Sequence, residues 1–248
     1  MLHIDLNCDM GEGSGNEEAL MPYISSASIA CGYHAGNAAE MKRVVELCIK
    51  YDVAIGAHPS FLDKENFGRT EMHLSGEAIY HLVKKQIEIL NLITVTAGGT
   101  LHHVKPHGAL YNMAAKDTVL ANAIAKAVKD FNSSLIFYGL SGSVMIDEAN
   151  KLGLHTANEV FADRTYQPDA SLTPRNQTNS LITDSSLAIQ QVMQIINDKT
   201  VTATNGLSVS IKADSVCIHG DGRHAIEFAK TLHNSLQNAG IIIQKINY

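Results

Sequence analysis

Short apolar segments alternate with amphipathic helical patterns along the chain, and this alternation most limits the folds it can adopt. Seven such segments end near residues 9, 34, 59, 108, 142, 164 and 221. They are too short for helices, and most lack strict apolar–polar alternation, which is typical of strands covered on both faces. A regular succession of strand and helix predicts a parallel sheet with right-handed crossovers.

The intervening helices begin at recognisable capping residues. Asn37 and Glu40 have the spacing of a capping box, and apolar residues then recur three and four positions apart. Similar patterns begin at or near Ser75, Asp117, Ser143, Asp184 and His224.

Two architectures fit this succession, an open doubly wound sheet and a closed (β/α) barrel. Polar residues follow nearly every apolar segment, and a barrel gathers all its strand ends around one mouth, whereas an open sheet places its site near a switch point. We therefore favour a (β/α) barrel forming a single domain over residues 1–248. The alternating segment 200–211 around Asn205-Gly206 predicts an added β-hairpin.

Composition excludes several classes of partner. The 248 residues carry a formal net charge of −6 and contain no basic run, so we expect neither a nucleic-acid partner nor a membrane surface. No segment approaches the ~18 apolar residues of a membrane span. The acidic N-terminal segment lacks a signal-peptide core, and the four cysteines form no CxxC pair, so we expect a cytoplasmic protein with reduced thiols.

Titratable and polar side chains cluster at the predicted strand ends. In a barrel they would converge on one rim, where burial and neighbouring charges shift pKa values. Each alone is consistent with a structural hydrogen bond or a surface ion pair, but together they predict an active site. The set is Asn7, Asp9, His34, His58, Lys105, His107, Ser141, Glu159, Asp163, Arg164, His219 and Asp221.

The segment LHHVKPHG shows how one strand end would serve this rim. Pro106 ends the strand, so His107 should project into the mouth, and Lys105 would supply a positive charge for an oxyanion or carboxylate. His103 shares the strand face of Lys105, whereas His102 faces the opposite way, and we leave His102 out of the site.

A metal ion and a cysteine nucleophile are two further possibilities for the same rim. Asp9, His34 and His58 follow three consecutive strands, and this trio would suit a hydrolytic metal, although no local H-E-x-x-H pair supports it. Cys31 lies near His34, but no third group that would orient such a pair is identifiable.

Two loops near the rim have their own signals. The glycine-rich loop at residues 11–15 contains Glu12, which would repel a phosphate, and no P-loop motif occurs in the chain. The long segment 56–70 is a candidate lid.

Six separated blocks carry a resemblance to a known family: DLNCDMGEG, IACGYHAG, GAHPSF with FGRT, HVKPHGALYN, EVFADRTY and VCIHGD. With these blocks in this order, the chain resembles the LamB/YcsF family. The resemblance implies a seven-stranded barrel akin to the glycoside hydrolase and deacetylase group. It also implies ATP-dependent opening of the lactam 5-oxoproline to L-glutamate, with two partner subunits, B and C, and with ATP and Mg²⁺ held partly or wholly by a partner.

For that chemistry the resemblance implies roles within the rim. Asp9 or Asp163 would deliver water as general base, and His107 or His219 would protonate the departing nitrogen. Lys105 and Arg164 would hold a carboxylate or phosphate. Arg69, in the FGRT block, joins Asn7, His34, His58, Glu159 and Asp221 as candidate substrate-binding residues.

Three rival functions remain open at this point. A metal-dependent amidase or carbohydrate deacetylase would depend on bound metal and act without ATP. A non-catalytic binding protein would bind ligand but lose no chemical activity on substitution of Lys105 or His107. A sugar-binding barrel would need aromatic stacking platforms, which a chain with 6% aromatic residues and no Trp scarcely offers.

Overall fold

The computed structural model describes residues 2–220, 222 and 224–248 and contains a closed parallel barrel. Each strand pairs in parallel with the next, and the last, β9, pairs with β1 and so closes the sheet. Closure confirms the barrel and excludes the open sheet. Within the described residues the barrel strands are β1 (His3–Met10), β2 (Ser26–Ala30), β3 (Ala54–His58), β4 (Leu101–Val104), β5 (Ile136–Leu140), β6 (Thr156–Phe161) and β9 (Ser215–Ile218).

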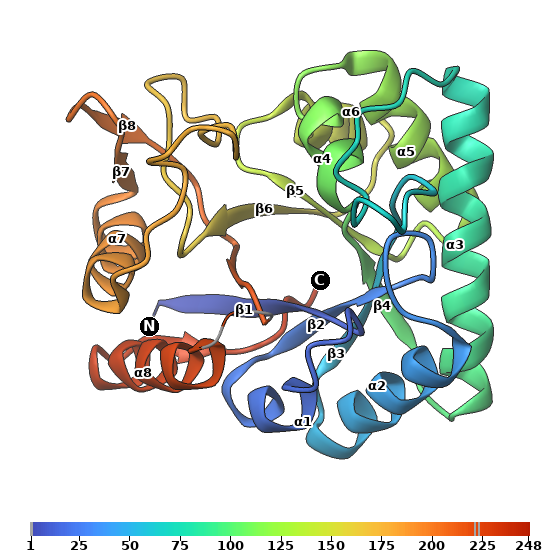
Figure 1. Cartoon of the computed structure of the whole chain (residues 1–248), viewed down its shortest axis with the longest axis horizontal. Helices are drawn as coiled ribbons and strands as arrows, with labels where there is room; N and C mark the ends of the chain where they lie inside the picture. Colours follow the sequence, from blue (N-terminus) through green and yellow to red (C-terminus); the bar gives the residue numbers. More distant parts are fainter. Residues whose placement is uncertain (1, 221, 223) are drawn as a thin grey trace.

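Helices surround the barrel, with the long α3 running along one side (Figure 1). All six predicted helix starts are confirmed. The side chains of Asn37, Ser75, Asp117 and Asp184 accept hydrogen bonds from backbone N–H groups of the first turn, as N-caps do. The helices are α2 (Ala38–Tyr51), α3 (Gly76–Thr96), α5 (Thr118–Phe131), α6 (Val144–Lys151), α7 (Ser185–Asp198) and α8 (Ala225–Asn238).

One part of the predicted capping box is wrong: the Glu40 side chain bonds to the glycine-rich loop instead of the Asn37 backbone. The Asn37 carboxamide oxygen accepts from the N–H groups of Ala39 and Glu40, as expected. The Glu40 carboxylate accepts from the Gly13 N–H at 2.9 Å, so it anchors the glycine-rich loop to α2.

The sequence analysis did not predict four short elements. They are α1 (Glu17–Leu20), the 3₁₀ turn η1 (Met21–Tyr23), α4 (Gly108–Ala114) and β10 (Ile242–Ile243), which adds to the start of β1. Segments of two to seven residues are too short to show a periodicity, so neighbouring structure decides their conformation.

The predicted hairpin is confirmed as β7 (Thr200–Thr202) and β8 (Ser208–Ser210), which pair antiparallel. It lies beside α7 at the edge of the molecule (Figure 1). Gly206 adopts a φ of 83°, which a turn residue with a side chain rarely tolerates.

The inside of the barrel is unusually polar. Along β1, Leu6, Cys8 and Met10 belong to the hydrophobic core, whereas the intervening side chains bond within the polar interior. Asp5 accepts bonds from Ser25, Ser26, Ser215 and Tyr138, and burial raises the pKa of this carboxyl despite those bonds. Strand β1 therefore alternates, although both of its faces are buried.

His102 and His103 have different surroundings, as predicted for neighbouring residues of a strand. His103 is fully buried and stacks on Tyr138, with its ring centroid 4.3 Å away. The His102 ring bonds to the Ile246 carbonyl in the C-terminal segment.

None of the helices in the described part of the chain is long and apolar enough to cross a membrane.

Candidate active site

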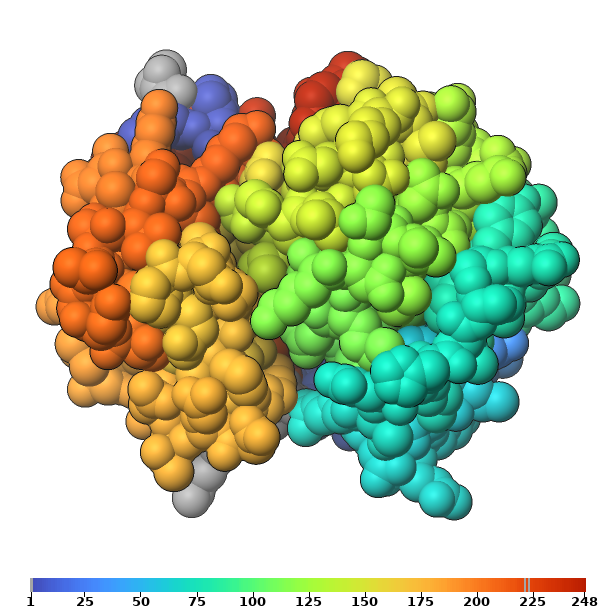
Figure 2. Space-filling view, turned by 90° about the horizontal axis from the view of Figure 1, so that it is seen from above, coloured from blue at the N-terminus to red at the C-terminus, as the bar shows by residue number. Residues whose placement is uncertain are grey.

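One cavity of about 650 Å³ opens where the barrel strands end, and it collects side chains from across the sequence. Figure 2 shows the surface hollowed between the amber segment near residues 165–180 and the cyan and green segments near residues 65–120. The predicted site residues that line it are Asp9, His58, Arg69, Lys105, His107, Glu159, Arg164 and His219.

Lys105 forms the floor of this cavity. Its ammonium group lies 2.5 Å from Asp9 Oδ1, and it donates to Glu159 Oε1 and Asn7 Oδ1, both at 2.8 Å. Burial alone would lower the pKa of Lys105, but Asp9, with Cys217 and Glu159, holds that pKa well above its usual value. Lys105 is therefore a fixed cation whose contacts are already supplied by the protein.

The same contacts set the state of Asp9. Burial would raise the pKa of this carboxyl, but His58 and Lys105 hold it well below the usual value. Asp9 is therefore ionised at neutral pH.

Glu159 and Asn7 lie beneath the cavity as supports. Both are fully buried, and Asn7 donates to Glu159 Oε1 at 3.1 Å and to Ser215. Tyr111 donates from its hydroxyl to Glu159 Oε2 at 2.7 Å. Sequence reasoning missed Tyr111 because α4, which carries it, was not expected. Its only signal was its place in the block HVKPHGALYN.

Three histidines and Glu12 form a compact group at one side of the floor. The rings of His34 and His107 stack with centroids 3.8 Å apart, and His58 meets both rings edge-on. Glu12 Oε1 lies 3.0, 3.8 and 4.0 Å from the Nε2 atoms of His34, His107 and His58. One ligand atom from each of these four residues falls within 4.8 Å of the others, so the group could hold a metal ion.

Electrostatics keeps His34 and His107 neutral. Burial lowers the pKa of His34, and burial together with the neighbouring histidines lowers the pKa of His107 well below its usual value. His34 Nδ1, His58 Nε2 and His107 Nδ1 are buried without a hydrogen bond. Neutral imidazoles with uncommitted nitrogens are the form in which histidine binds metals.

This group overlaps the predicted metal trio without matching it. His34 and His58 belong to both, but Glu12 and His107 stand where Asp9 was expected. Asp9 Oδ2 lies beside the group, 3.3 Å from His58 Nε2, while its other oxygen contacts Lys105. The sequence suggested Glu12 only as a group that would repel phosphate. The positive φ angles of Gly11 and Gly13 turn the loop, a path that sequence reasoning did not anticipate.

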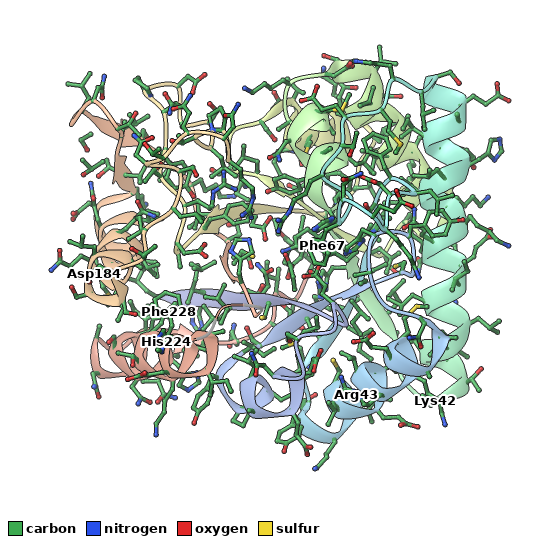
Figure 3. All side chains as sticks on the ribbon, in the orientation of Figure 1. Lys42, Arg43, Phe67, Asp184, His224 and Phe228 are labelled. Atoms are coloured by element: carbon green, nitrogen blue, oxygen red, sulfur yellow. The ribbon has the colours of Figure 1, made fainter. Side chains whose placement is uncertain are left out.

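The long loop after β3 covers the histidines. Phe67 points toward the middle of the molecule (Figure 3), and its ring meets those of His34 and His107 at centroid distances of 5.6 and 5.4 Å. At Gly68, where φ is +66°, an added Cβ would lie 2.3 Å from Ser60 Oγ and 2.8 Å from His34 Cβ. Only glycine fits this close approach.

A second titratable pair, Asp163 and His219, lies on the other side of the mouth. His219 Nδ1 is 2.8 and 2.9 Å from the two carboxylate oxygens of Asp163, and Arg175 donates to His219 Nε2 at 3.2 Å. Burial would lower the pKa of His219, but the Asp163 carboxylate raises it. The pKa of Asp163 is lowered, because His219 outweighs the effect of burial.

Three remaining candidates have different surroundings. Arg164 is 3% exposed, and its guanidinium donates to the carbonyl oxygens of Thr173 and Ser180, so these donors brace a loop. Asp221 lies outside the described residues. Cys31 is buried, and burial raises the pKa of its thiol to about 12, which leaves it protonated and inert as a nucleophile.

Comparisons with known proteins identify the family. The LamB/YcsF family model matches residues 4–248. The chain belongs to the LamB/YcsF family. It is 52% identical over 248 residues to the A subunit of 5-oxoprolinase from Geobacillus kaustophilus, with 98% of this chain and 97% of that protein covered.

Solved structures agree with this assignment. The crystal structure of the lactam utilization protein from Thermus thermophilus superimposes with a TM-score of 0.92 at 39% identity, covering 99% of this chain and all of that one. The peptidoglycan deacetylase PdaC from Bacillus subtilis has a TM-score of 0.52 at 11% identity, covering 99% of this chain and 88% of that one. This weaker likeness concerns the fold alone and confirms that the barrel resembles those of deacetylases.

Replacing Lys105 tests the buried floor. Lys105→Met leaves the buried Asp9 and Glu159 carboxylates without their cation, so we expect the free energy of unfolding to fall by about 3–5 kcal/mol. Urea denaturation followed by circular dichroism measures this loss. Lys230→Met, at an exposed position on α8, is the matched control. A Lys105→Met loss as small as that of the control would show that the ion pairs do not hold the floor together.

Proposed function

We propose that this chain is the A subunit of an ATP-dependent 5-oxoprolinase, which opens the lactam ring of 5-oxoproline to give L-glutamate. The observation that carries the proposal is a cavity with Asp9 and a histidine cluster on one side and the hydrogen-bonded pair His219–Asp163 on the other. The choice of 5-oxoproline as substrate rests on its family relatives, which are named as A subunits of 5-oxoprolinase. The same name supports assembly with partner subunits, which we propose to be B and C.

ATP makes the reaction feasible because a lactam carbonyl is a poor electrophile. Transfer of the γ-phosphoryl group to the lactam oxygen breaks the terminal anhydride bond of ATP and leaves an electrophilic ring carbon. Water adds to that carbon, and the ring C–N bond breaks as the nitrogen takes up a proton. A second water then hydrolyses the resulting acyl phosphate to L-glutamate and phosphate. We place ATP and its Mg²⁺ on a partner protein of the complex, since the sequence contains no P-loop motif.

The chain's own residues divide this work between the two sides of the cavity. Asp9, kept ionised by His58 and Lys105, accepts a hydrogen bond from the attacking water and orients it beside His58. His219, hydrogen-bonded to Asp163 and with a raised pKa, donates a proton from Nε2 to the departing nitrogen. Lys105 cannot also hold the substrate, because its donors face Asp9, Glu159 and Asn7.

A divalent metal fits the group formed by Glu12, His34, His58 and His107. Three histidines and one carboxylate that can each offer a ligand atom within 4.8 Å of the others are a donor set that suits zinc-like ions. When bound, such an ion would polarise an oxygen of the substrate or lower the pKa of a coordinated water. The covering loop with Phe67 and Gly68 would limit access of solvent to these ligands.

Metal content tests this assignment directly. We expect the purified chain to bind about one equivalent of Zn²⁺ or Co²⁺, and His107→Ala to lower the affinity by about 10- to 100-fold or more, because an inner ligand is lost. Equilibrium dialysis with elemental analysis measures the stoichiometry and the affinity. His81→Ala, at an exposed position on α3, should bind like the wild type. Equal binding by both variants would remove the metal from the proposal.

The His219–Asp163 pair predicts a particular pH dependence. A general acid works in its protonated form, so activity should fall as the pH rises through the pKa of His219. Asp163→Asn removes the carboxylate that raises this pKa, so this limb of the kcat/KM profile should move to lower pH. His219→Ala should lower kcat by about 10²- to 10⁴-fold. A profile unchanged in Asp163→Asn would assign the acid role elsewhere.

Reconstitution separates the proposal from its main rival, a metal-dependent amidase or deacetylase. We expect glutamate release from 5-oxoproline only when the chain, the B and C partners and ATP are all present. Chromatography of released glutamate, paired with phosphate release, provides the measurement. Hydrolysis by the chain alone, without ATP, would favour the rival. ATP-dependent release that survives both Asp9→Ala and His219→Ala would favour a non-catalytic binding protein.

A further inference from the structure

The mouth contains cations that the mechanism above does not use. The donors of Lys105 face Asp9, Glu159 and Asn7, and the buried Arg164 uses two guanidinium nitrogens on backbone carbonyls. The exposed cations of the mouth are therefore the more accessible partners for an anionic substrate group. Arg69, Lys116 and Arg175 line the same cavity from exposed positions. Of these, Arg175 contacts the proposed acid, with a guanidinium nitrogen 3.2 Å from His219 Nε2.

The loop that carries Arg175 is held at its base. The Arg164 guanidinium donates to the carbonyls of Thr173 and Ser180, which flank the segment 174–179 on either side. The Ser180 hydroxyl donates to the Arg175 carbonyl at 3.4 Å. Arg164 therefore positions this loop, and the Arg175 side chain reaches the cavity from a braced backbone.

The chemistry of the proposed substrate matches this placement. In 5-oxoproline the carboxylate is attached to the carbon next to the ring nitrogen, so only two bonds separate its carbon from that nitrogen. If His219 Nε2 faces the ring nitrogen, the carboxylate must lie beside Nε2, where the guanidinium of Arg175 already lies. Arginine is suited to such a group because it binds carboxylates through two parallel hydrogen bonds.

We propose that Arg175 determines specificity by binding the substrate carboxylate, so that the site selects lactams with a carboxylate beside the ring nitrogen. This inference rests on the proposed function and deepens it. In the free protein the Arg175 guanidinium donates to His219 Nε2. The incoming carboxylate takes over this donor, so Nε2 is free to take up a proton and then to donate it to the ring nitrogen. Binding of a substrate with this carboxylate therefore also frees His219 from Arg175.

A pair of lactams tests the proposal in the assembled enzyme. 2-Pyrrolidinone has the same ring as 5-oxoproline without the carboxylate. We expect Arg175→Gln to lower kcat/KM for 5-oxoproline by about 10- to 100-fold, the value of a charge-assisted hydrogen bond, and to change that for 2-pyrrolidinone by less than about threefold. Arg175→Lys, which keeps the charge but not the fork, should fall between. Lys230→Gln controls for the loss of one positive charge.

Two results would overturn the proposal. One is an equal loss for both lactams in Arg175→Gln, which would indicate a general structural defect. The other is a loss of discrimination in Arg69→Gln but not in Arg175→Gln, which would assign the carboxylate to the opposite side of the mouth.

Binding measurements keep this test separate from the proposed reaction. Calorimetric titration with 5-oxoproline needs no turnover, and its affinity should fall in Arg175→Gln even if the wild-type complex fails to open the ring. In addition, the pKa of His219 measured by NMR should rise in Arg175→Gln, because the guanidinium lowers it. A wild-type chain and complex that neither bind nor convert 5-oxoproline would overturn this inference together with the proposed function.

Discussion

A lysine ammonium buried between two carboxylates is the interaction on which the rest of the site depends. Removing Lys105, Asp9 and Glu159 from water costs several kcal/mol per ion, and close contacts must offset that cost. The contacts join β1, β6 and the end of β4, with α4 added through Tyr111. The mouth therefore rests on a floor of paired charges. In the proposed mechanism the substrate is therefore contacted by other side chains of the mouth and not by Lys105.

Histidines on the two sides of the mouth have opposite electrostatic environments. His107 is stacked on another imidazole, and burial with like charges lowers its pKa. His219 contacts a carboxylate, which raises its pKa despite burial. One side thus favours neutral nitrogens and the other favours a protonated ring. Titratable groups whose pKa values are pushed apart within one cavity are a common arrangement for acid–base catalysis.

The barrel was predictable because its signals are local and repeated. Helix starts at Asn37, Ser75, Asp117 and Asp184 follow from side chains that accept their own first-turn N–H groups. The hairpin follows from Asn205-Gly206, whose turn geometry few other residue pairs adopt. Helix α4 was missed because its seven residues show no periodicity and begin directly after the Lys105-Pro106-His107 turn.

Sequence by itself determined the order of the barrel strands and main helices, many of the residues that line the mouth and the family blocks that contain them. The tertiary structure alone decided which of those residues meet. It brought Glu12 to the histidines through a turn of left-handed glycines, committed Lys105 and Arg164 to protein acceptors, and placed Arg175 against His219 across 44 positions of sequence. The physical reason is that periodicity and capping act over a few residues, whereas charge pairing and desolvation depend on distances that only barrel closure sets.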